Sequence, residues 1–594
     1  MHPTRPSLRW LPAGSPLACQ APAPSPGPPH PSSSASSGLD ADHRSDDIHI
    51  VHPSRHAASP RAESGRTFSR CPDPSPSAIV ANTDLTTIVT PPPARGLIDS
   101  SSALVIHWFD NVCPAWSGFD SNANPIRTIA VDVWRSSVTV GNALEAMSAA
   151  FLASRDPSMR RSAMRLMRRA ADYAQVELGM MRAGTHPSQR SDGMALPTGL
   201  LFSLFGVGTT VCWVDAHSLG LPFLRETRRL LARLNRQQRS RPGAVDAERL
   251  EFFNKCMTYC DMLLSVVHDD DDVVDNYPIL GNDSLAPPLP PYLSTASFDT
   301  GPALGPTISY HPSNIVAMAA ENRPHPWTGI SSLSSRLFAE TMGLCRRVQL
   351  RSGMAAASLP AHYLLAERLE EQLLNAEIEV PVVPDLDIPS GSLWHLGDTG
   401  DARTPPSHLA LIAEAYRLSS LLVFYETFPS FGFLRLRGRM LPTGDDGDDG
   451  DYGHHSSGTT APLSRPAVLW QEWITPLSLH LLQVLERIPL TSGSRVIQPL
   501  LYICASTGLR QPDITDEPGP EARSECESLK VRNGRSFVLQ RLSVLESSLP
   551  PTPVTMAKEL VRAIWRAYDA SPPGSAPVHW INVMEAANLR SMFG

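Results

Sequence analysis

The sequence lacks the short motifs that mark many enzyme active sites. Neither G-x-S-x-G, nor H-E-x-x-H, nor a complete G-x-x-x-x-G-K-[ST] occurs in its 594 residues. These absences exclude a serine-hydrolase elbow, a zinc-protease helix and a nucleotide-binding P-loop. Paired histidines in a recognisable catalytic setting are missing too. We therefore expect a protein that is not an enzyme.

Cysteine is scarce and poorly spaced for chemistry. The chain has nine cysteines, and no two have the C-x-x-C spacing of zinc and redox sites. The low, odd number favours a reducing intracellular compartment. Cys256 and Cys260 are one helical turn apart, but no nearby histidine pair completes a tetrahedral zinc site. We expect both to be buried structural thiols, since free cysteine usually behaves as a small hydrophobic residue.

Alternating strand patterns are missing as well, and helical spacing takes their place from about residue 102 onward. The amphipathic segments that we expect to form helices are 125–155, 158–183, 218–239, 246–268, 331–351, 361–378, 405–428, 466–489 and 554–570. The predicted fold class is therefore all-α, a large multi-helix domain.

Residues 195–214 form an uncharged stretch that contains GLLFSLFGVGTTVCWV. It is long enough for one membrane span, but Pro197, three glycines and the lack of basic anchors favour a buried core helix. Its G-V-G-T-T fragment lacks the third glycine and the preceding strand of a dinucleotide-binding fold. We expect no membrane contact and no nucleotide.

The composition divides the chain into a tail and a domain. Residues 1–98 hold 18 of the 57 prolines and show no periodicity, which predicts a disordered Pro/Ser-rich tail. The helical domain is expected over 102–594. Two stretches without periodicity, 279–313 and 441–464, are predicted to be loop insertions.

An acidic run, HDDDDVVD at 268–275, contains the spacing DD-x-x-D in Asp271, Asp272 and Asp275. In all-α isoprenoid synthases this spacing holds magnesium against a diphosphate, because a hard cation needs several oxygen ligands. Those enzymes need a second magnesium-binding set, and the sequence contains none. We favour a solvated helix end, with the magnesium-dependent isoprenoid-type enzyme as the alternative.

A basic run lies in 225–241, RETRRLLARLNRQQRSR. Three leucines keep an apolar stripe, so the simplest interpretation is an amphipathic helix with a basic outer face. The functional alternative is a nuclear-import signal or a phosphate-binding patch. The arginines concerned are Arg225, Arg228, Arg229, Arg233, Arg236, Arg239 and Arg241.

Six segments, in order, resemble the regulatory domain of fungal-specific transcription factors, the helical region that follows the binuclear zinc cluster in many fungal gene regulators. The resemblance covers about 102–594. The segments are IHWFDNVCPAWSGFDSNANPIR at 106–127, ALEAMSAAFLAS at 143–154, CWVDAHSLGLPFL at 212–224, EAYRLSSLLVFYETFP at 414–429, IQPLLYICASTGLR at 497–510 and HWINVMEAANLRSMFG at 579–594.

The first segment carries no catalytic pattern and is expected to be scaffold. Four residues are predicted to pack on the bundle: Phe109, Val112, Trp116 and Phe119. Pro114 and Asn124-Pro125 are expected at helix starts. In the third segment, which resembles a Trp-x-x-x-His helix, we expect His217 to be a core histidine.

The resemblance implies a nuclear regulator of transcription by RNA polymerase II. It also implies partners among the transcription machinery or other regulators; a homodimer and a small-molecule effector in a cleft between helices stay open. The zinc cluster needs six cysteines, yet only Cys19 and Cys71 precede the domain. Zinc is therefore expected only if a cluster is encoded upstream, and DNA is otherwise reached through a partner. A non-nuclear helical scaffold is a further alternative.

Overall fold

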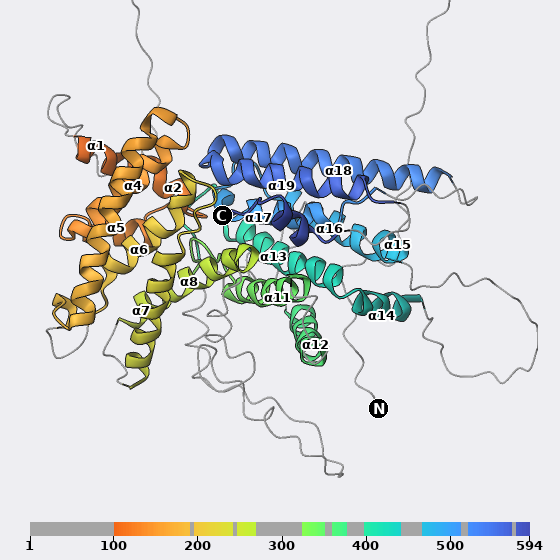
Figure 1. Ribbon diagram of the computed structural model, residues 1–594, viewed down its shortest axis with the longest axis horizontal. Coiled ribbons are helices and arrows are strands. Elements are labelled where there is room, and N and C mark those ends of the chain that lie inside the picture. The colour runs from red at the N-terminus through yellow and green to blue at the C-terminus, as the bar shows by residue number, and fades with distance from the viewer. Residues whose placement is uncertain are drawn as a thin grey trace, which may run out of the picture. The chain divides into compact units, whose positions relative to one another are not determined.

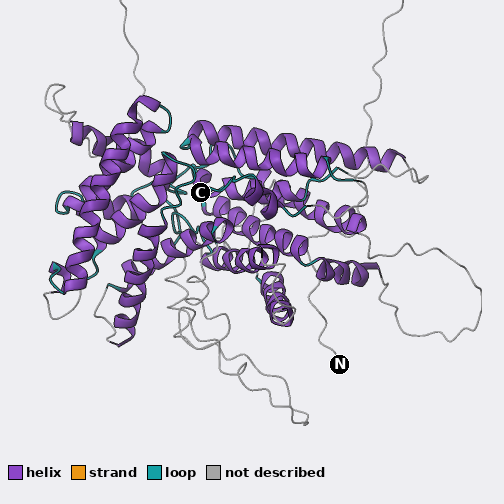
Figure 2. Cartoon of the chain, in the orientation of Figure 1, coloured by secondary structure: helices purple, strands orange, loops and turns teal. Residues whose placement is uncertain are grey.

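The computed structural model describes residues 100–189, 195–240, 246–268, 323–350, 359–376, 397–440, 466–511, 521–572 and 578–594. These residues form helices, turns and loops, and the described part of the chain contains no β-strand (Figure 2). The predicted all-α fold class is confirmed. The predicted tail at 1–98 and the two predicted insertions at 279–313 and 441–464 lie outside the described residues.

The helices up to residue 268 come first in Figure 1, coloured from orange to yellow-green. Their bounds are α1 Ser100–His107, η1 Trp108–Val112 (a π-helical turn), α2 Cys113–Trp116, α3 Pro125–Val133, α4 Val138–Ala153, η2 Pro157–Met159, α5 Arg160–Ala183, η3 Pro187–Gln189, α6 Thr198–Thr210, η4 Val211–Trp213, α7 Leu221–Ser240 and α8 Ala247–Val267.

The remaining helices run from green to blue in the same figure. Their bounds are α11 Ser332–Leu350, α12 Leu359–Asn375, α13 Pro406–Thr427, α14 Pro429–Met440, α15 Pro466–Leu469, η7 Trp470–Ile474 (a second π-helical turn), α16 Thr475–Glu486, η8 Ser494–Ile497, α17 Pro499–Thr507, α18 Glu521–Ser548, α19 Pro551–Asp569 and α20 Trp580–Ala586.

The core is built around helices that are apolar on every side. All nine residues of α17 are buried, and α13 is buried along nearly its whole length. Helices α8, α11, α16 and α17 pack against one another or against α13. A helix that is hydrophobic all round has to lie in the centre of a large domain, and burial of each large apolar side chain contributes about 1.5–3 kcal/mol.

One segment that was predicted to be a single helix forms two helices in the structure. The segment 125–155 is broken between α3 and α4, where Ser137 adopts an extended conformation and its side chain accepts a hydrogen bond from the Val140 amide. Serine is a strong N-cap because its hydroxyl satisfies one free amide of the first turn. The apolar pattern continues across the break, so periodicity alone did not reveal it.

The segment 106–127 joins distant parts of the domain. Trp116 is buried; its indole nitrogen donates to Thr209 Oγ1 at 2.9 Å, and its carbonyl accepts from Trp327 Nε1 at 2.6 Å. The Gly118 amide donates to the Pro326 carbonyl at 2.7 Å. This segment therefore holds α6 and the 323–330 loop together.

The turn that follows is closed by Asn124, which is fully buried. Its Oδ1 accepts from the Ile126 amide, and its Nδ2 donates to Ser117 Oγ and to the Phe119 carbonyl. Pro125 then occupies the first position of α3, where a missing amide costs nothing. Val112, Trp116 and Phe119 are buried, whereas Phe109 is half-buried. The predicted packing of this segment on the bundle is therefore confirmed for three of its four residues.

Candidate functional site

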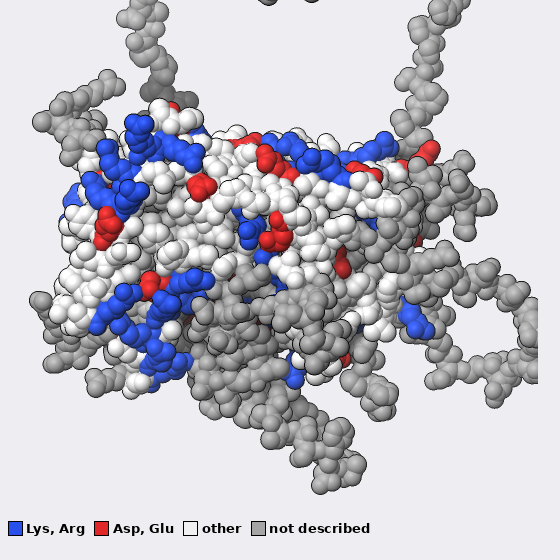
Figure 3. All heavy atoms as spheres, viewed as in Figure 1, with Lys and Arg blue, Asp and Glu red and all other residues white. Residues whose placement is uncertain are grey.

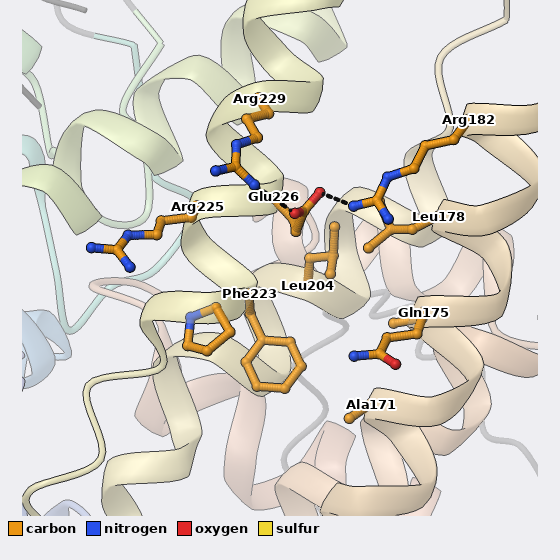
Figure 4. Close-up of a pocket in the computed structure, with 11 residues that line it drawn as sticks. Ala171, Gln175, Leu178, Arg182, Leu204, Phe223, Arg225, Glu226 and Arg229 are labelled. Carbon is orange, nitrogen blue, oxygen red and sulfur yellow. Dashed lines mark hydrogen bonds and ion pairs between the residues drawn. The ribbon is translucent and has the colours of Figure 1, made fainter. Parts of the chain in front are cut away.

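A groove of about 570 Å³ lies between α5, α6 and α7 (Figure 4). Its apolar lining includes Ala171 and Leu178 from α5, Leu204 from α6 and Phe223 from α7. Leu178 and Leu204 are 7% and 1% exposed, so they form the packed floor. The groove combines a hydrophobic base with the charged side chains of its rim.

The buried helix α6 positions both walls of the groove. Helices α5 and α7 each pack against it. The turn into α7 needs Gly220, which has φ +63°; a Cβ there would lie 1.8 Å from the Gly208 carbonyl oxygen. Only glycine allows this approach of the two backbones. The core helix predicted at 199–214 is α6, which ends at Thr210. Both walls of the groove pack on it.

Three arginines and one glutamate line the rim. Glu226 is shared: its Oε2 lies 2.7 Å from Arg182 Nη2, and its Oε1 lies 2.8 Å from Arg229 Nη1. The side chains of Arg182 and Arg229 are 64% and 69% exposed, whereas that of Glu226 is 24% exposed. Figure 4 shows both guanidinium groups turned toward this one carboxylate. Arg225 completes the rim.

Two of the arginines of the basic run contact α8 or the residue that follows it. Arg228 forms an ion pair with the buried carboxylate of Asp261. Arg225 Nη2 lies 3.2 Å from Nε2 of His268, the residue that follows α8. A charge that is paired inside the protein contributes little to binding an outside partner, so these two arginines join α7 to α8.

The outer arginines lie on the exposed side of α7. Arg229, Arg236 and Arg239 are exposed and Arg233 is half-buried, while Arg241 lies outside the described residues. Figure 3 shows basic side chains gathered over α7 on the visible face. The buried residues of α7 include Leu224, Leu230, Leu231 and Leu234, so α7 is amphipathic with a basic outer face.

The acidic residues proposed as magnesium ligands, Asp271, Asp272 and Asp275, lie outside the described residues. Only the first residue of the run, His268, is described, and it contacts Arg225 of the groove rim. The magnesium hypothesis stays a prediction. Within the described parts of the chain, no group of three or more His, Cys, Asp or Glu side chains is arranged to hold a metal ion.

Cys256 and Cys260 are both buried on α8. Burial raises the pKa of both thiols well above the ordinary value, so both stay protonated and neither is a ready metal ligand. The sequence did not reveal that His325 packs here, with Nε2 3.5 Å from Cys256 Sγ. Burial lowers the pKa of His325 to about 3, and its Nδ1 accepts from the Trp327 and Thr328 amides. The neutral side chain of His325 thus stabilises the fold of the 323–330 loop through these hydrogen bonds.

A family model described as the fungal specific transcription factor domain matches residues 103–594. The chain belongs to this family. No curated protein and no solved structure matches it. In this fungal transcription factor domain, the six segments that carried the resemblance form the stretch from η1 to the start of α3, α4, the α6–α7 connection, α13, α17, and α20 with the end of the chain.

One expectation about the domain is wrong. His217 does not lie in the core of a helix: α6 ends at Thr210, a 3-10 turn covers Val211–Trp213, and His217 is exposed in the turn before α7. Trp213 is buried as its apolar character suggests. The chain has to reverse here so that Gly220 can meet Gly208, and Asp215 accepts backbone and side-chain hydrogen bonds in that turn.

A half-buried acidic site in the same domain was not predicted. Glu426, near the end of α13, accepts a hydrogen bond from Thr507 Oγ1 of α17. Burial raises the pKa of Glu426 to about 8, and the Thr507 hydrogen bond opposes that rise. The residues are 81 positions apart, so no local pattern pairs them. The next residue, Thr427, bonds through Oγ1 to His579 Nε2 at 3.1 Å.

The zinc cluster of many family members does not fit the described residues. They include seven free cysteines, of which six are buried and Cys526 is half-buried. No pair of cysteines in the sequence has the C-x-x-C spacing of a cluster.

Among the described helices, none is long and apolar enough to cross a membrane.

Proposed function

We propose that this chain is a nuclear regulator of transcription by RNA polymerase II that acts through its helical domain by binding partner proteins. The match to the fungal specific transcription factor domain over residues 103–594 carries the proposal. DNA is reached through a partner, or through a zinc cluster encoded outside this sequence.

The chemistry of the described residues supports a binding role. Several charged groups are paired within the fold, as with Arg228 and Asp261 or Arg346 and Glu585. The pKa values that shift furthest belong to thiols, phenols, histidines and the Glu426 carboxyl, and burial is the main cause of these shifts. The exposed arginines of α7 beside an open groove are what such a domain offers to other proteins.

Nuclear location and effect on transcription are the first tests. A fluorescent fusion of the full chain should accumulate in nuclei, and deletion of the gene should change the abundance of a defined set of transcripts. Exclusion from nuclei together with an unchanged transcriptome would contradict the proposal and favour a cytoplasmic helical scaffold.

The outer arginines of α7 provide a sharper test of nuclear entry. Substituting Arg233, Arg236 and Arg239 with alanine should shift the fusion toward the cytoplasm, because an import signal depends on clustered positive charge. The matched control substitutes Arg160, Arg161 and Arg165, which are exposed on α5, and should leave the distribution unchanged. Equal effects of both triple variants would show that total charge matters and that α7 carries no signal.

Sequencing the transcript from its 5′ end tests how DNA is reached. An upstream in-frame exon with six suitably spaced cysteines would assign direct DNA binding to this protein. Confirmation of Met1 as the start would require a partner, which co-purification of a tagged full chain should then yield.

A further inference from the structure

The lining of the groove continues along α5 as a stripe of apolar and polar side chains, in which Arg168 and Gln175 stand between Met164, Ala171 and Leu178. Met164, Ala171 and Leu178 are seven residues apart, so they lie on one side of the helix two turns from one another. Met164 is 46% exposed and Ala171 is half-buried. From Met164 to Arg182 the stripe spans about 27 Å at 1.5 Å per residue. It is long, shallow and open on its outer side.

The charges of this surface are unbalanced. Arg182 and Arg229 share the single carboxylate of Glu226, with contacts of 2.7 and 2.8 Å. Two guanidinium groups against one carboxylate leave a formal charge of +1 at the rim. Both arginines are about two-thirds exposed, and a guanidinium has donors in excess of those used in one such contact. A second carboxylate placed here would therefore be bound by both arginines.

The shape and chemistry distinguish among occupants. A small molecule is usually held in a pocket that encloses most of its surface, whereas Arg182 and Arg229 leave this groove open. A nucleic acid needs a row of unshared cations for its phosphates, whereas Glu226 lies among the arginines and the floor is apolar. An amphipathic helix fits both features, because it places an apolar face in a groove and carries charge at its edge.

We propose that the groove between α5 and α7 is the docking site for an amphipathic helix of a partner protein. The apolar face of that helix lies along Met164, Ala171 and Phe223, and an acidic side chain at its edge binds Arg182 and Arg229. The inference deepens the proposed function, since it states how the domain holds a partner. Its test measures peptide binding in vitro. The docking proposal can therefore fail while the nuclear location and the effect on transcription are confirmed, and the proposed function can fail while peptide binding is confirmed.

The experiment uses the purified full chain and two fluorescein-labelled peptides of about 18 residues, the length of the stripe. Both carry leucines at helical i, i+3, i+4, i+7 spacing; one has glutamates at the edge of the apolar face and the other has lysines there. Fluorescence anisotropy should show the glutamate peptide bound at least about tenfold more tightly than the lysine peptide.

Variants tie that preference to the groove. Arg182→Glu with Arg229→Glu should reverse the preference between the peptides, since the rim becomes acidic. Gln175→Trp, an exposed lining residue, should weaken both peptides by filling the groove. The matched control, Arg562→Glu with Arg566→Glu on the exposed side of α19, makes the same change in net charge and should leave both affinities unchanged. Circular dichroism confirms that each variant is folded.

Three results would overturn the proposal. One is the absence of saturable binding of the glutamate peptide up to about 1 mM, the weak limit of specific association. Another is equal weakening by the rim and control variants, which would show unspecific attraction. The third is a labelled DNA duplex that displaces the peptide and loses affinity in Arg182→Glu with Arg229→Glu, which would assign the groove to nucleic acid.

Discussion

The groove region of α5 to α7 and the core around α13 and α20 use the same kinds of charged groups differently. In the core, Arg346 is 2% exposed; it donates to the Val266 carbonyl at 2.9 Å and lies 2.7 Å from Glu585. In the groove region, Arg182 is 64% exposed and shares its carboxylate partner with another arginine. The core charge is enclosed by the protein, whereas the groove charge is partly available to an outside carboxylate.

This difference indicates where function is to be sought. An enclosed charge has to keep its partners, because a lone buried ion is costly, and it therefore fixes one arrangement of helices. An exposed, shared charge contributes little to stability and can exchange partners. The domain thus combines a core that sets its geometry with a surface where charges can exchange partners.

The largest predicted effect concerns the packing beneath the groove. Gly220→Ala should destabilise the protein by at least about 3 kcal/mol, because alanine is strained at φ +63° and its Cβ would meet the Gly208 carbonyl oxygen. Urea unfolding followed by circular dichroism measures the loss.

Gly179→Ala is the matched control. Gly179 is exposed within α5, and its Cβ would meet nothing within 4 Å. Alanine should stabilise here by about 0.5–1 kcal/mol through its higher helix propensity. Similar losses at the two glycines would contradict the close contact between α6 and the turn into α7.

The second prediction tests the contrast between the two charge environments directly. Arg346→Ala should cost about 3–5 kcal/mol, because it removes a buried cation that joins α11 to α8 and α20. Arg182→Ala should cost no more than about 1 kcal/mol, since its ion pair is exposed. Thermal and urea unfolding of the two variants under identical conditions give the comparison. Equal losses of stability in the two variants would contradict the distinction between the enclosed charge of the core and the exposed charge of the groove.

The third prediction concerns the turn that begins α3. Asn124→Ala should cost about 2–3 kcal/mol, because it removes the cap of α3 and leaves Ser117 Oγ and the Phe119 carbonyl without their donor. Ser137→Ala, which removes the cap of α4 in a half-buried position, should cost only about 1 kcal/mol. A loss at Asn124 no greater than that at Ser137 would show that its amide bonds add nothing to capping.

Local signals allowed much of the fold to be predicted. The Asn-Pro step at 124–125 marks a helix start that the structure confirms, and the arginine-rich run forms an amphipathic helix with its leucines inward. Helix α18 was not assigned, although Val531, Val538, Leu542 and Leu545 are buried on one side of it. Polar residues and Gly534 dilute that stripe in the sequence.

The groove could not have been predicted, because it depends on tertiary packing. Arg182 and Glu226 are 44 residues apart and meet only because α5 and α7 both pack on α6. The same limit applies to His217, whose exposure depends on where α6 ends. It applies also to Glu426, whose partner Thr507 arrives from a later helix. Periodicity predicts which face of a helix is buried, but not which helix covers it.

The smallest predicted effect is a pH dependence that originates in the core. Glu426 has a folded-state pKa raised from 4.5 to about 8. Between these values the folded chain holds a proton that the unfolded chain has released. Its contribution to stability is therefore complete below pH 4.5 and is lost as the pH rises through 8.

His325 and His579 have folded-state pKa values lowered from 6.5 to about 3 by burial. These two histidines change the stability in the opposite sense, because the unfolded chain binds protons at a higher pH than the folded chain does. Their contribution to the pH dependence of stability therefore ends near pH 6.5 as the pH rises. The free energy of unfolding should therefore fall by about 1–2 kcal/mol between pH 6.5 and pH 8, and Glu426→Gln should remove that fall.

Thr507→Val, which removes the hydrogen bond that opposes the raised pKa of Glu426, should extend the fall to higher pH. Urea unfolding at half-unit pH steps measures all three proteins. Parallel curves for the wild type and Glu426→Gln would show that this carboxyl is ionised in the folded chain, and would contradict its raised pKa.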